Sequence, residues 1–312
     1  MRAALSLVGT FILTLPICAQ TLPQTRTIPV PALVEVKSGE IAYDLSANDF
    51  TIKDQGIEQK VKLDEADSAP HSLILVIQTG RNASLQRDKI DHLDSLLDTI
   101  VTSPADQIGV LTFDSRPHVL QKLTADSNAV SHTLGNIPSG DQGAAMFDAL
   151  NAAVAMFSQA PAENRRVILL ISGEHDHGSL ASSTAPLIRS ISLANVTVYS
   201  LTFGAPKREF LGKLWSMNPL AMTAGAMSRN AAEALAQLTG GDFYRFGSEK
   251  NFDDHIGEMA NHIHNSYWLS FQPDDPAPGF HSLQVGVRRA RTTIVAARSG
   301  YWIPAAGEAE SQ

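Results

Sequence analysis

The sequence predicts an α/β protein whose central sheet is mostly parallel and covered by helices on both faces. Continuous apolar runs, without polar alternation, occur at 73–77 and 167–171, and the segment 108–113 is expected to be a further buried strand. Such runs are typical of strands buried on both faces of a parallel sheet. Segments with helical spacing of apolar residues separate these runs, so strands and helices alternate along the chain.

The first nineteen residues carry the pattern of a secretory signal peptide. Arg2 precedes an apolar segment, 3–17, and the small residue Ala19 precedes a plausible cleavage point. The apolar segment is shorter than the roughly 20 residues of a membrane-spanning helix. Cys18 suggests a lipoprotein, but Ile17 stands where its cleavage motif needs a small residue. We therefore expect a secreted or periplasmic protein, bacterial in style and not lipidated, with no stable membrane span and no cysteine after cleavage.

Strand-like segments are expected at both ends of the mature chain. The two end regions are 20–66 and 265–303, and a disordered tail is expected at 304–312. Because the ends of a domain commonly lie close together, we expect the two regions to pair into one small antiparallel β domain. The predicted strands of this domain are 28–36, 40–43, 50–52, 58–63, 267–271, 283–287 and 292–297.

The α/β domain is expected to span residues 71–264. Asp126 and Ser84 are of the residue types that favour the first position before a helix. A long segment, 204–228, contains three methionines and matches neither strand nor helix spacing; it is either a binding surface or a helix packed on its own domain. The predicted helices are 84–102, 126–136, 146–157, 183–194, 229–238 and 251–264, and further strands are expected at 119–123, 196–203 and 243–246.

Composition and motifs exclude several classes of function. The formal net charge is −8, and no basic run is interleaved with aromatic residues, so nucleic acid is not an expected partner. The chain has no Gly-x-Ser-x-Gly elbow, no His-Glu-x-x-His and no phosphate-binding glycine loop. We therefore expect a protein that is not an enzyme.

The loops at the carboxyl ends of parallel strands form the ligand crevice of an open α/β sheet. Three loops, 78–84, 140–145 and 173–179, are expected to meet there. The order of the first strand and helix, then GAAMFDAL at 143–150, then VILLISGEHDHGS at 167–179, resembles the von Willebrand factor type A (vWA) domain. The flanking sequences at 45–61 and 267–302 are similar to those of secreted bacterial vWA proteins common in acidobacteria.

The resemblance implies a Rossmann-like, doubly wound fold and protein binding at a metal-ion-dependent adhesion site (MIDAS). The usual first motif, Asp-x-Ser-x-Ser, is replaced here by Gln78, Gly80 and Asn82. The threonine and aspartate expected at two further positions fall on Ala144 and Gly173. Because Mg²⁺ prefers charged, hard oxygen ligands, we expect a degenerate MIDAS without Mg²⁺ and no cofactor.

The expected function is protein binding through the crevice loops without an obligatory metal. Arg81, Ser84, His175 and His177 are the predicted partner contacts. One alternative is a structural envelope component whose crevice is vestigial and whose other surfaces make the contacts.

A second alternative is a metal-binding protein or metal-dependent enzyme. Its ligands would be four adjacent residues, Glu174, His175, Asp176 and His177, whose imidazoles and carboxylates suit Zn²⁺. Adjacent residues of an extended loop point in different directions, which argues against a common metal.

Overall fold

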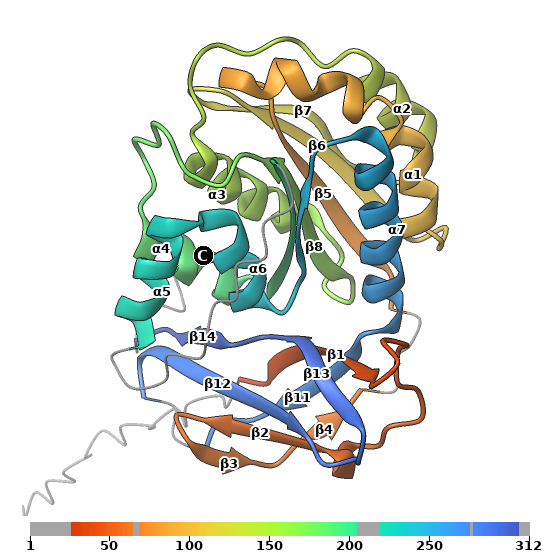
Figure 1. Cartoon of the computed structure of the whole chain (residues 1–312). Helices are drawn as coiled ribbons and strands as arrows, with labels where there is room; N and C mark the ends of the chain where they lie inside the picture. The colour runs from red at the N-terminus through yellow and green to blue at the C-terminus, as the bar shows by residue number, and fades with distance from the viewer. Residues whose placement is uncertain (1–25, 65–68, 205–218, 275–276, 306–312) are drawn as a thin grey trace, which may run out of the picture.

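The computed structural model describes residues 26–64, 69–204, 219–274 and 277–305 (Figure 1). A mixed sheet of six strands, flanked by helices, lies above two smaller antiparallel sheets. The fold class predicted from the sequence is therefore confirmed. The predicted signal peptide and most of the predicted tail lie outside the described residues. Within the described part of the chain, no helix has the length and apolar character needed to cross a membrane.

The central sheet has the strand order β10-β9-β8-β5-β6-β7, with β7 antiparallel to β6 and the other neighbours parallel. All eight residues of β5 are buried, as its continuous apolar sequence predicts. The strands are β5 (His71–Gln78), β6 (Gln107–Phe113), β7 (Pro117–Thr124), β8 (Arg165–Ser172), β9 (Val196–Phe203) and β10 (Phe243–Phe246).

Helices cover both faces of this sheet (Figure 1). Alternate side chains of β5 enter two separate cores: Ile74 and Val76 join one, and Leu73, Leu75 and Ile77 join the other. The first core is closed by α3 (Met146–Met156), α4 (Thr184–Leu193), α5 (Pro219–Arg229) and α6 (Ala231–Thr239). The second is closed by α1 (Leu93–Ile100), α2 (Ser127–Gly135) and α7 (Glu249–Asn265).

The two ends of the chain form one β domain, as predicted. β1 lies between β13 and β11 in one sheet, and β2 pairs with β12 in the other. The first sheet contains β13 (Thr292–Ala297), β1 (Ile28–Val36), β11 (Tyr267–Phe271) and β4 (Lys62–Leu63). The second contains β14 (Gly300–Ile303), β12 (Gly279–Val287), β2 (Phe50–Asp54) and β3 (Ile57–Gln59).

A buried arginine joins the β domain to the end of α4. The Arg298 guanidinium donates to the carbonyl oxygens of Ser192 at 3.2 Å and Pro29 at 3.1 Å. A cation is favourable at a helix C-terminus because the last carbonyl groups carry partial negative charge. The β domain therefore holds the C-terminal end of α4, a helix that covers one face of the central sheet (Figure 1).

The predicted helix at 84–102 is wrong in its first half. A 3-10 helix, η2 (Arg81–Lys89), comes first, and α1 begins only at Leu93. The residue before η2 is Gly80, so Ser84 is not the N-cap. Because a 3-10 helix turns about 120° per residue, apolar side chains at α-helical spacing do not share one face. Leu85 consequently leaves the core and is 71% exposed.

The predicted strand at 40–43 is also wrong. Ile41 forms one isolated bridge with Glu35 after the turn at Gly39. β11 pairs with β1 from Ile28 to Ala32. Residues 40–43 can therefore pair with this side of β1 only beyond Ala32. At the other end of the chain, the fourth C-terminal strand, β14, was not predicted. In the methionine-containing segment, Met227 is buried in the core, whereas residues 205–218 lie outside the described residues.

Candidate functional site

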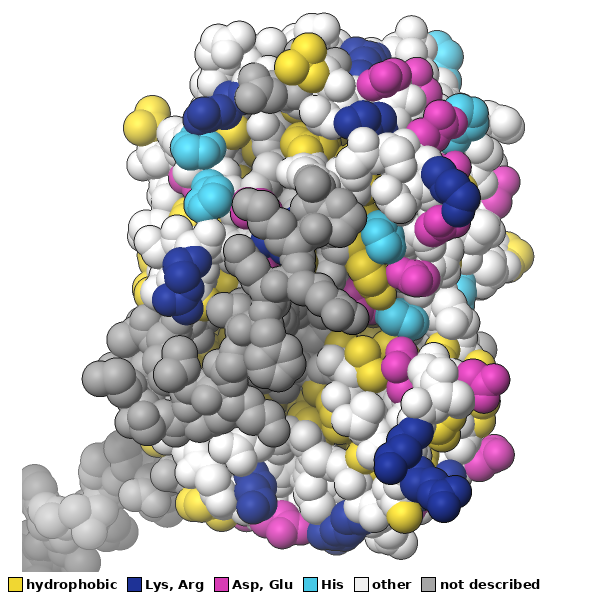
Figure 2. Space-filling model, viewed as in Figure 1, with side chains coloured by type: hydrophobic (Ala, Val, Ile, Leu, Met, Phe, Trp, Pro, Cys, Tyr) yellow, Lys and Arg dark blue, Asp and Glu magenta, His cyan; other side chains and the backbone are white. Residues whose placement is uncertain are grey.

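The candidate site lies where the connections from the central strands diverge. The chain leaves β5 toward β6 on one side, and β8 lies on the other side of β5. In open α/β sheets a ligand crevice forms at such a switch point. A hollow of about 550 Å³ lies here, and its lining includes Gln78, Arg81, Gly173, His175 and His177. Figure 2 shows basic and histidine side chains grouped at the upper left of this face.

The side-chain amide of Gln78 links two crevice loops. Its Oε1 accepts a hydrogen bond from the Gly173 backbone N at 2.9 Å, and its Nε2 donates to the Gly80 carbonyl oxygen at 3.1 Å. Gln78 is buried, so each contact replaces a bond to water. Three of the five predicted MIDAS positions are therefore joined by one amide group.

The fourth position, Ala144, joins the same crevice through its backbone. The Ala144 N donates to the His177 carbonyl oxygen at 2.9 Å, and the His177 N donates back to the Ala144 oxygen at 2.8 Å. This pair fixes the loop after β8 against the start of α3. The fifth position, Asn82, lies in η2, as does Ser84. The side chains of these two residues are outside what the structure describes.

The loops approach one another backbone to backbone. A Cβ atom added to Gly80 would lie 2.0 Å from the Gly143 carbonyl oxygen and 2.9 Å from the Cα of Asp114. A Cβ on Gly143 would lie 2.4 Å from the Cα of Ser115. Gly80 has φ −84° and ψ 171°, which any residue can adopt. Close packing, not backbone conformation, is therefore what requires glycine at this position.

The residues at the five predicted positions do not fit a Mg²⁺ ion, because they supply no carboxylate or hydroxyl. Two nearby carboxylates, those of Asp114 and Asp141, already accept hydrogen bonds from residues of the neighbouring loops. Asp114 Oδ1 accepts from His118 at 3.0 Å, and Asp141 Oδ1 accepts from the Gly143 N at 2.7 Å. Burial raises the pKa of Asp114, but hydrogen bonds from His118 and the backbone outweigh it and hold this pKa below its usual value. Among the described residues, no group of three His, Cys, Asp or Glu side chains is arranged to hold a metal.

The acidic residues of the loop after β8 point to different protein groups. Glu174 Oε1 is 2.6 Å from Nε of Arg245. Asp176 Oδ1 accepts from the Phe147 backbone N at 3.0 Å and from the Ser179 hydroxyl at 2.6 Å. The His175 and His177 rings lie 6.1 Å apart, but the two carboxylates proposed as further Zn²⁺ ligands are held by other protein groups, which weakens that alternative.

The same loop is held along its length by α3. Asp148 Oδ2 accepts from the backbone N of Leu180 at 2.9 Å and of Ala181 at 3.3 Å. The Asn151 amide donates to the Ser182 hydroxyl at 2.6 Å. The side chain of Leu180 is nevertheless 95% exposed. The loop thus presents a large apolar side chain to solvent on a fixed backbone.

Sequence reasoning missed Leu180, although a signal existed. It is the one large apolar side chain in the polar run 173–184, GEHDHGSLASST. Sequence reasoning also missed a second hollow of about 370 Å³ on the other side of η2. Its lining includes Ile77, Leu93, Ile137 and Arg87, and it shares Gln78 and Ala83 with the first hollow.

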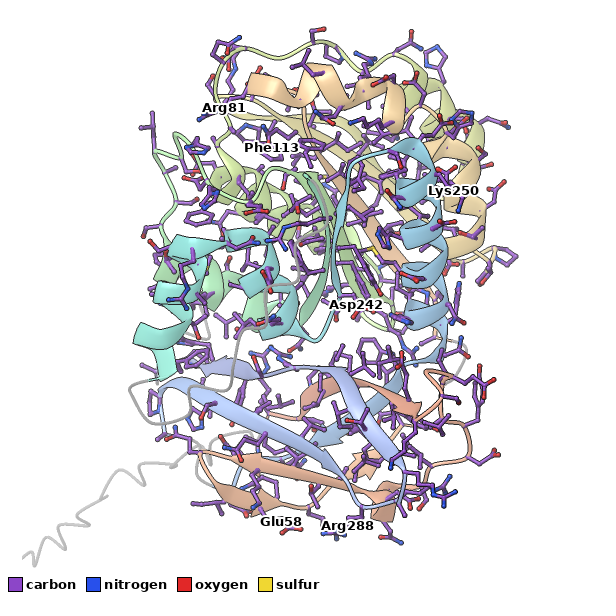
Figure 3. All side chains as sticks on the ribbon, viewed as in Figure 1. Glu58, Arg81, Phe113, Asp242, Lys250 and Arg288 are labelled. Atoms are coloured by element: carbon purple, nitrogen blue, oxygen red, sulfur yellow. The ribbon has the colours of Figure 1, made fainter. Side chains whose placement is uncertain are left out.

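Three cationic or titratable side chains meet at the rim of the 550 Å³ hollow. Partial burial and the nearby Arg81 and His175 lower the pKa of His177, and Asp176 partly offsets this. Arg81 is exposed, and its φ of +54° places it in the left-handed region. Figure 3 shows Arg81 at the carboxyl edge of the sheet, the edge that Phe113 marks at the end of β6.

Residues 74–175 match the family model of the von Willebrand factor type A domain. No curated protein matches the chain. Among solved structures, a von Willebrand factor type A protein from Catenulispora acidiphila is 11% identical, with 90% of this chain and 74% of that chain covered and a TM-score of 0.48. Proximal thread matrix protein 1 from the mussel byssus is 14% identical, with 75% and 50% covered and a TM-score of 0.48. BatB from Bacteroides thetaiotaomicron is 16% identical, with 61% and 99% covered and a TM-score of 0.43.

Proposed function

We propose that this chain, which contains a vWA domain, is a secreted, non-catalytic module that binds another protein through its crevice loops without a metal ion. The observation that carries the proposal is the loop after β8, whose backbone is fixed while its apolar and imidazole side chains face solvent. Export is supported by the sequence of residues 1–19, with its basic start and short apolar core.

A fixed loop favours binding because little conformational freedom is lost on association. The carboxylate of Asp148 holds the backbone N atoms of Leu180 and Ala181, and the backbone pair between Ala144 and His177 fixes the loop closer to β8. Protein-binding surfaces combine an apolar centre with a polar rim, and Leu180 lies exposed among the polar residues of this loop. Leu180 is therefore the predicted anchor of the interface.

Metal independence is supported by the contacts of Gln78. In a metal site, a cation would hold the loops after β5 and β8 together. Here the Gln78 amide does so through hydrogen bonds to Gly80 and Gly173. The loops therefore have a defined arrangement before any ligand arrives.

The test is capture of a partner from envelope and culture-medium proteins of the producing organism, with EDTA present throughout. We expect Leu180→Asp to abolish capture, because a charge replaces the exposed apolar anchor. The matched control is Ile57→Asp in β3 of the β domain, where the side chain is 60% exposed. This control should retain capture.

The reverse pattern would contradict the proposal. Loss of capture in Ile57→Asp, with full capture by Leu180→Asp, would favour the alternative in which the β domain makes the contacts and the crevice is vestigial. Capture that disappears when EDTA is added would overturn metal independence.

A further inference from the structure

We propose that the 370 Å³ hollow on the other side of η2 is a second binding site, which takes a basic segment of a partner protein anchored by one apolar side chain. The hollow lies between η2, the start of α1 and the chain that leaves α2. Helices α1 and α2 lie side by side here (Figure 1). The inference goes beyond the proposed function, because no described residue of the loop after β8 lines this hollow.

The floor of the hollow, meaning the apolar side chains that line it, is an uncovered part of the second core. Ile77 at the end of β5 and Leu93 at the start of α1 are buried members of that core. Ile90, Leu134 and Ile137 pack against the same core but are only half-buried, and all three line the hollow. Ligand pockets typically have volumes of roughly 300–1,000 Å³ and mainly apolar linings, so both size and floor suit a bound apolar group.

The break between η2 and α1 shapes one wall of the hollow. Arg87 and Ile90 are three residues apart, which is one turn of a 3-10 helix, so they lie on the same face and both line this hollow. The Leu93 N donates to the Ile90 carbonyl oxygen at 3.1 Å. On the opposite wall, the Asn136 N donates to the Thr133 carbonyl oxygen at 3.1 Å. Because both walls have a defined backbone before a ligand arrives, little conformational freedom is lost on binding.

The rim of the hollow carries two unpaired carboxylates. Asp91 and Asp94 line the hollow and are exposed. Within the described part of the chain, neither carboxylate accepts a hydrogen bond or pairs with a cation. Arg87 is the one lysine or arginine among the described lining residues. The η2 residues whose side chains lie outside the description, Asn82 and Ser84, are uncharged and leave this balance unchanged.

The surrounding segment, residues 87–98, has the same sign of charge. Lys89 donates to Gln86 at 2.7 Å and lines the other hollow. An excess of exposed carboxylates favours a cationic partner and disfavours an acidic one. An apolar centre with an acidic rim therefore fits one apolar side chain flanked by lysines or arginines. The segment contains four exposed aspartates, Asp88, Asp91, Asp94 and Asp98, against the two cations Arg87 and Lys89.

The experiment measures binding of a peptide in which one leucine is flanked by two lysines on each side. Fluorescein is attached through a Gly-Ser spacer, and fluorescence anisotropy is followed with the mature chain at about 0.15 M ionic strength. Replacing the leucine by serine should weaken binding by about tenfold or more, as expected when a buried leucine side chain is removed. A peptide with glutamates in place of the lysines should bind more weakly still.

Two double variants test the rim. Asp91→Asn with Asp94→Asn should weaken binding by about fivefold or more, because each substitution removes an ion pair with the peptide. Asp88→Asn with Asp98→Asn is the matched control, since it removes the same charge from the same segment but changes no lining residue. Charges more than roughly 8 Å apart are largely screened at this ionic strength, so the control should change the affinity less than about twofold. Arg87→Gln should strengthen binding by about twofold, because it removes the opposing charge.

Four results would overturn the inference: no binding of the lysine peptide, equal affinity of its leucine and serine forms, equal loss in the two double variants, or tighter binding of the glutamate peptide. Concentration-dependent dimerisation that Ile137→Ser abolishes, measured by analytical ultracentrifugation, would make a second copy of the chain the occupant and would also overturn it. The outcome is separable from that of the proposed function. Leu180→Asp should leave peptide binding unchanged, and loss of peptide binding in this variant would overturn the assignment of a separate site.

Discussion

Replacement of Gly80 by alanine tests how closely the crevice loops pack against one another. A Cβ at this position would lie 2.0 Å from the Gly143 carbonyl oxygen, well inside the roughly 3.4 Å at which carbon and oxygen make contact. Gly143 cannot simply retreat, because its backbone N donates to Asp141 and its own Cα faces the Cα of Ser115. We expect Gly80→Ala to lower the free energy of unfolding by about 3 kcal/mol, at the upper end of overpacking costs.

The measurement is urea-induced unfolding followed by circular dichroism, with Gly257→Ala as the matched control. Gly257 lies in α7, and a Cβ added there would meet no atom within 4 Å, so alanine should raise the free energy of unfolding by up to about 1 kcal/mol through helix propensity. The backbone angles at Gly80 suit alanine, so without the close contact Gly80→Ala would also be neutral or stabilising. A Gly80→Ala protein as stable as the unmodified chain would refute the packing argument. It would also mean that the serine of the usual MIDAS motif could be accommodated here.

The remaining predictions concern metal ions and acid. Calorimetric titration with Mg²⁺, Mn²⁺, Ca²⁺ and Zn²⁺ should show no micromolar binding, and micromolar Mg²⁺ binding would contradict the role assigned to Gln78. Burial lowers the pKa of His71 to about 4; Asp106 opposes this, while Arg165 and His264 add to it. Protonation of His71 is thus harder in the folded state, so stability is full above pH 6.5 and falls by up to about 3 kcal/mol as pH drops toward 4. Urea titrations across this range should show a shallower loss for His71→Gln, and an unchanged slope would exclude His71 as the cause.

The fold was predictable because strands that are buried on both faces have mostly apolar sequences. β5 and β8 contain continuous apolar runs and β6 is mostly apolar, since each contacts helices on both faces. The pairing of the chain ends was also predictable, because strand-like segments at both ends need partners. The 3-10 geometry of η2 was not, since periodicity alone does not distinguish i→i+3 from i→i+4 hydrogen bonding over a segment of nine residues. β14 was not predicted, although β10, a strand of the same length, was.

The candidate site was predictable in position but not in its contacts. Motif order placed Gln78, Gly80, Ala144 and Gly173 at one crevice, and the structure brings the loops that carry them together. The exposure of Leu180 depends on hydrogen bonds from its backbone to Asp148 in another element, which no local pattern encodes.

Glutamine at position 78 has a chemical consequence that an aspartate there would not have. A carboxylate can only accept hydrogen bonds, whereas an amide both accepts and donates. Gln78 faces one donor, the Gly173 N, and one acceptor, the Gly80 oxygen, so the amide satisfies both. A carboxylate in its place would satisfy Gly173 and repel the Gly80 oxygen unless a cation lay between them. The local hydrogen-bonding groups are therefore matched to an amide, which supports the proposal that the crevice binds its partner without a metal ion.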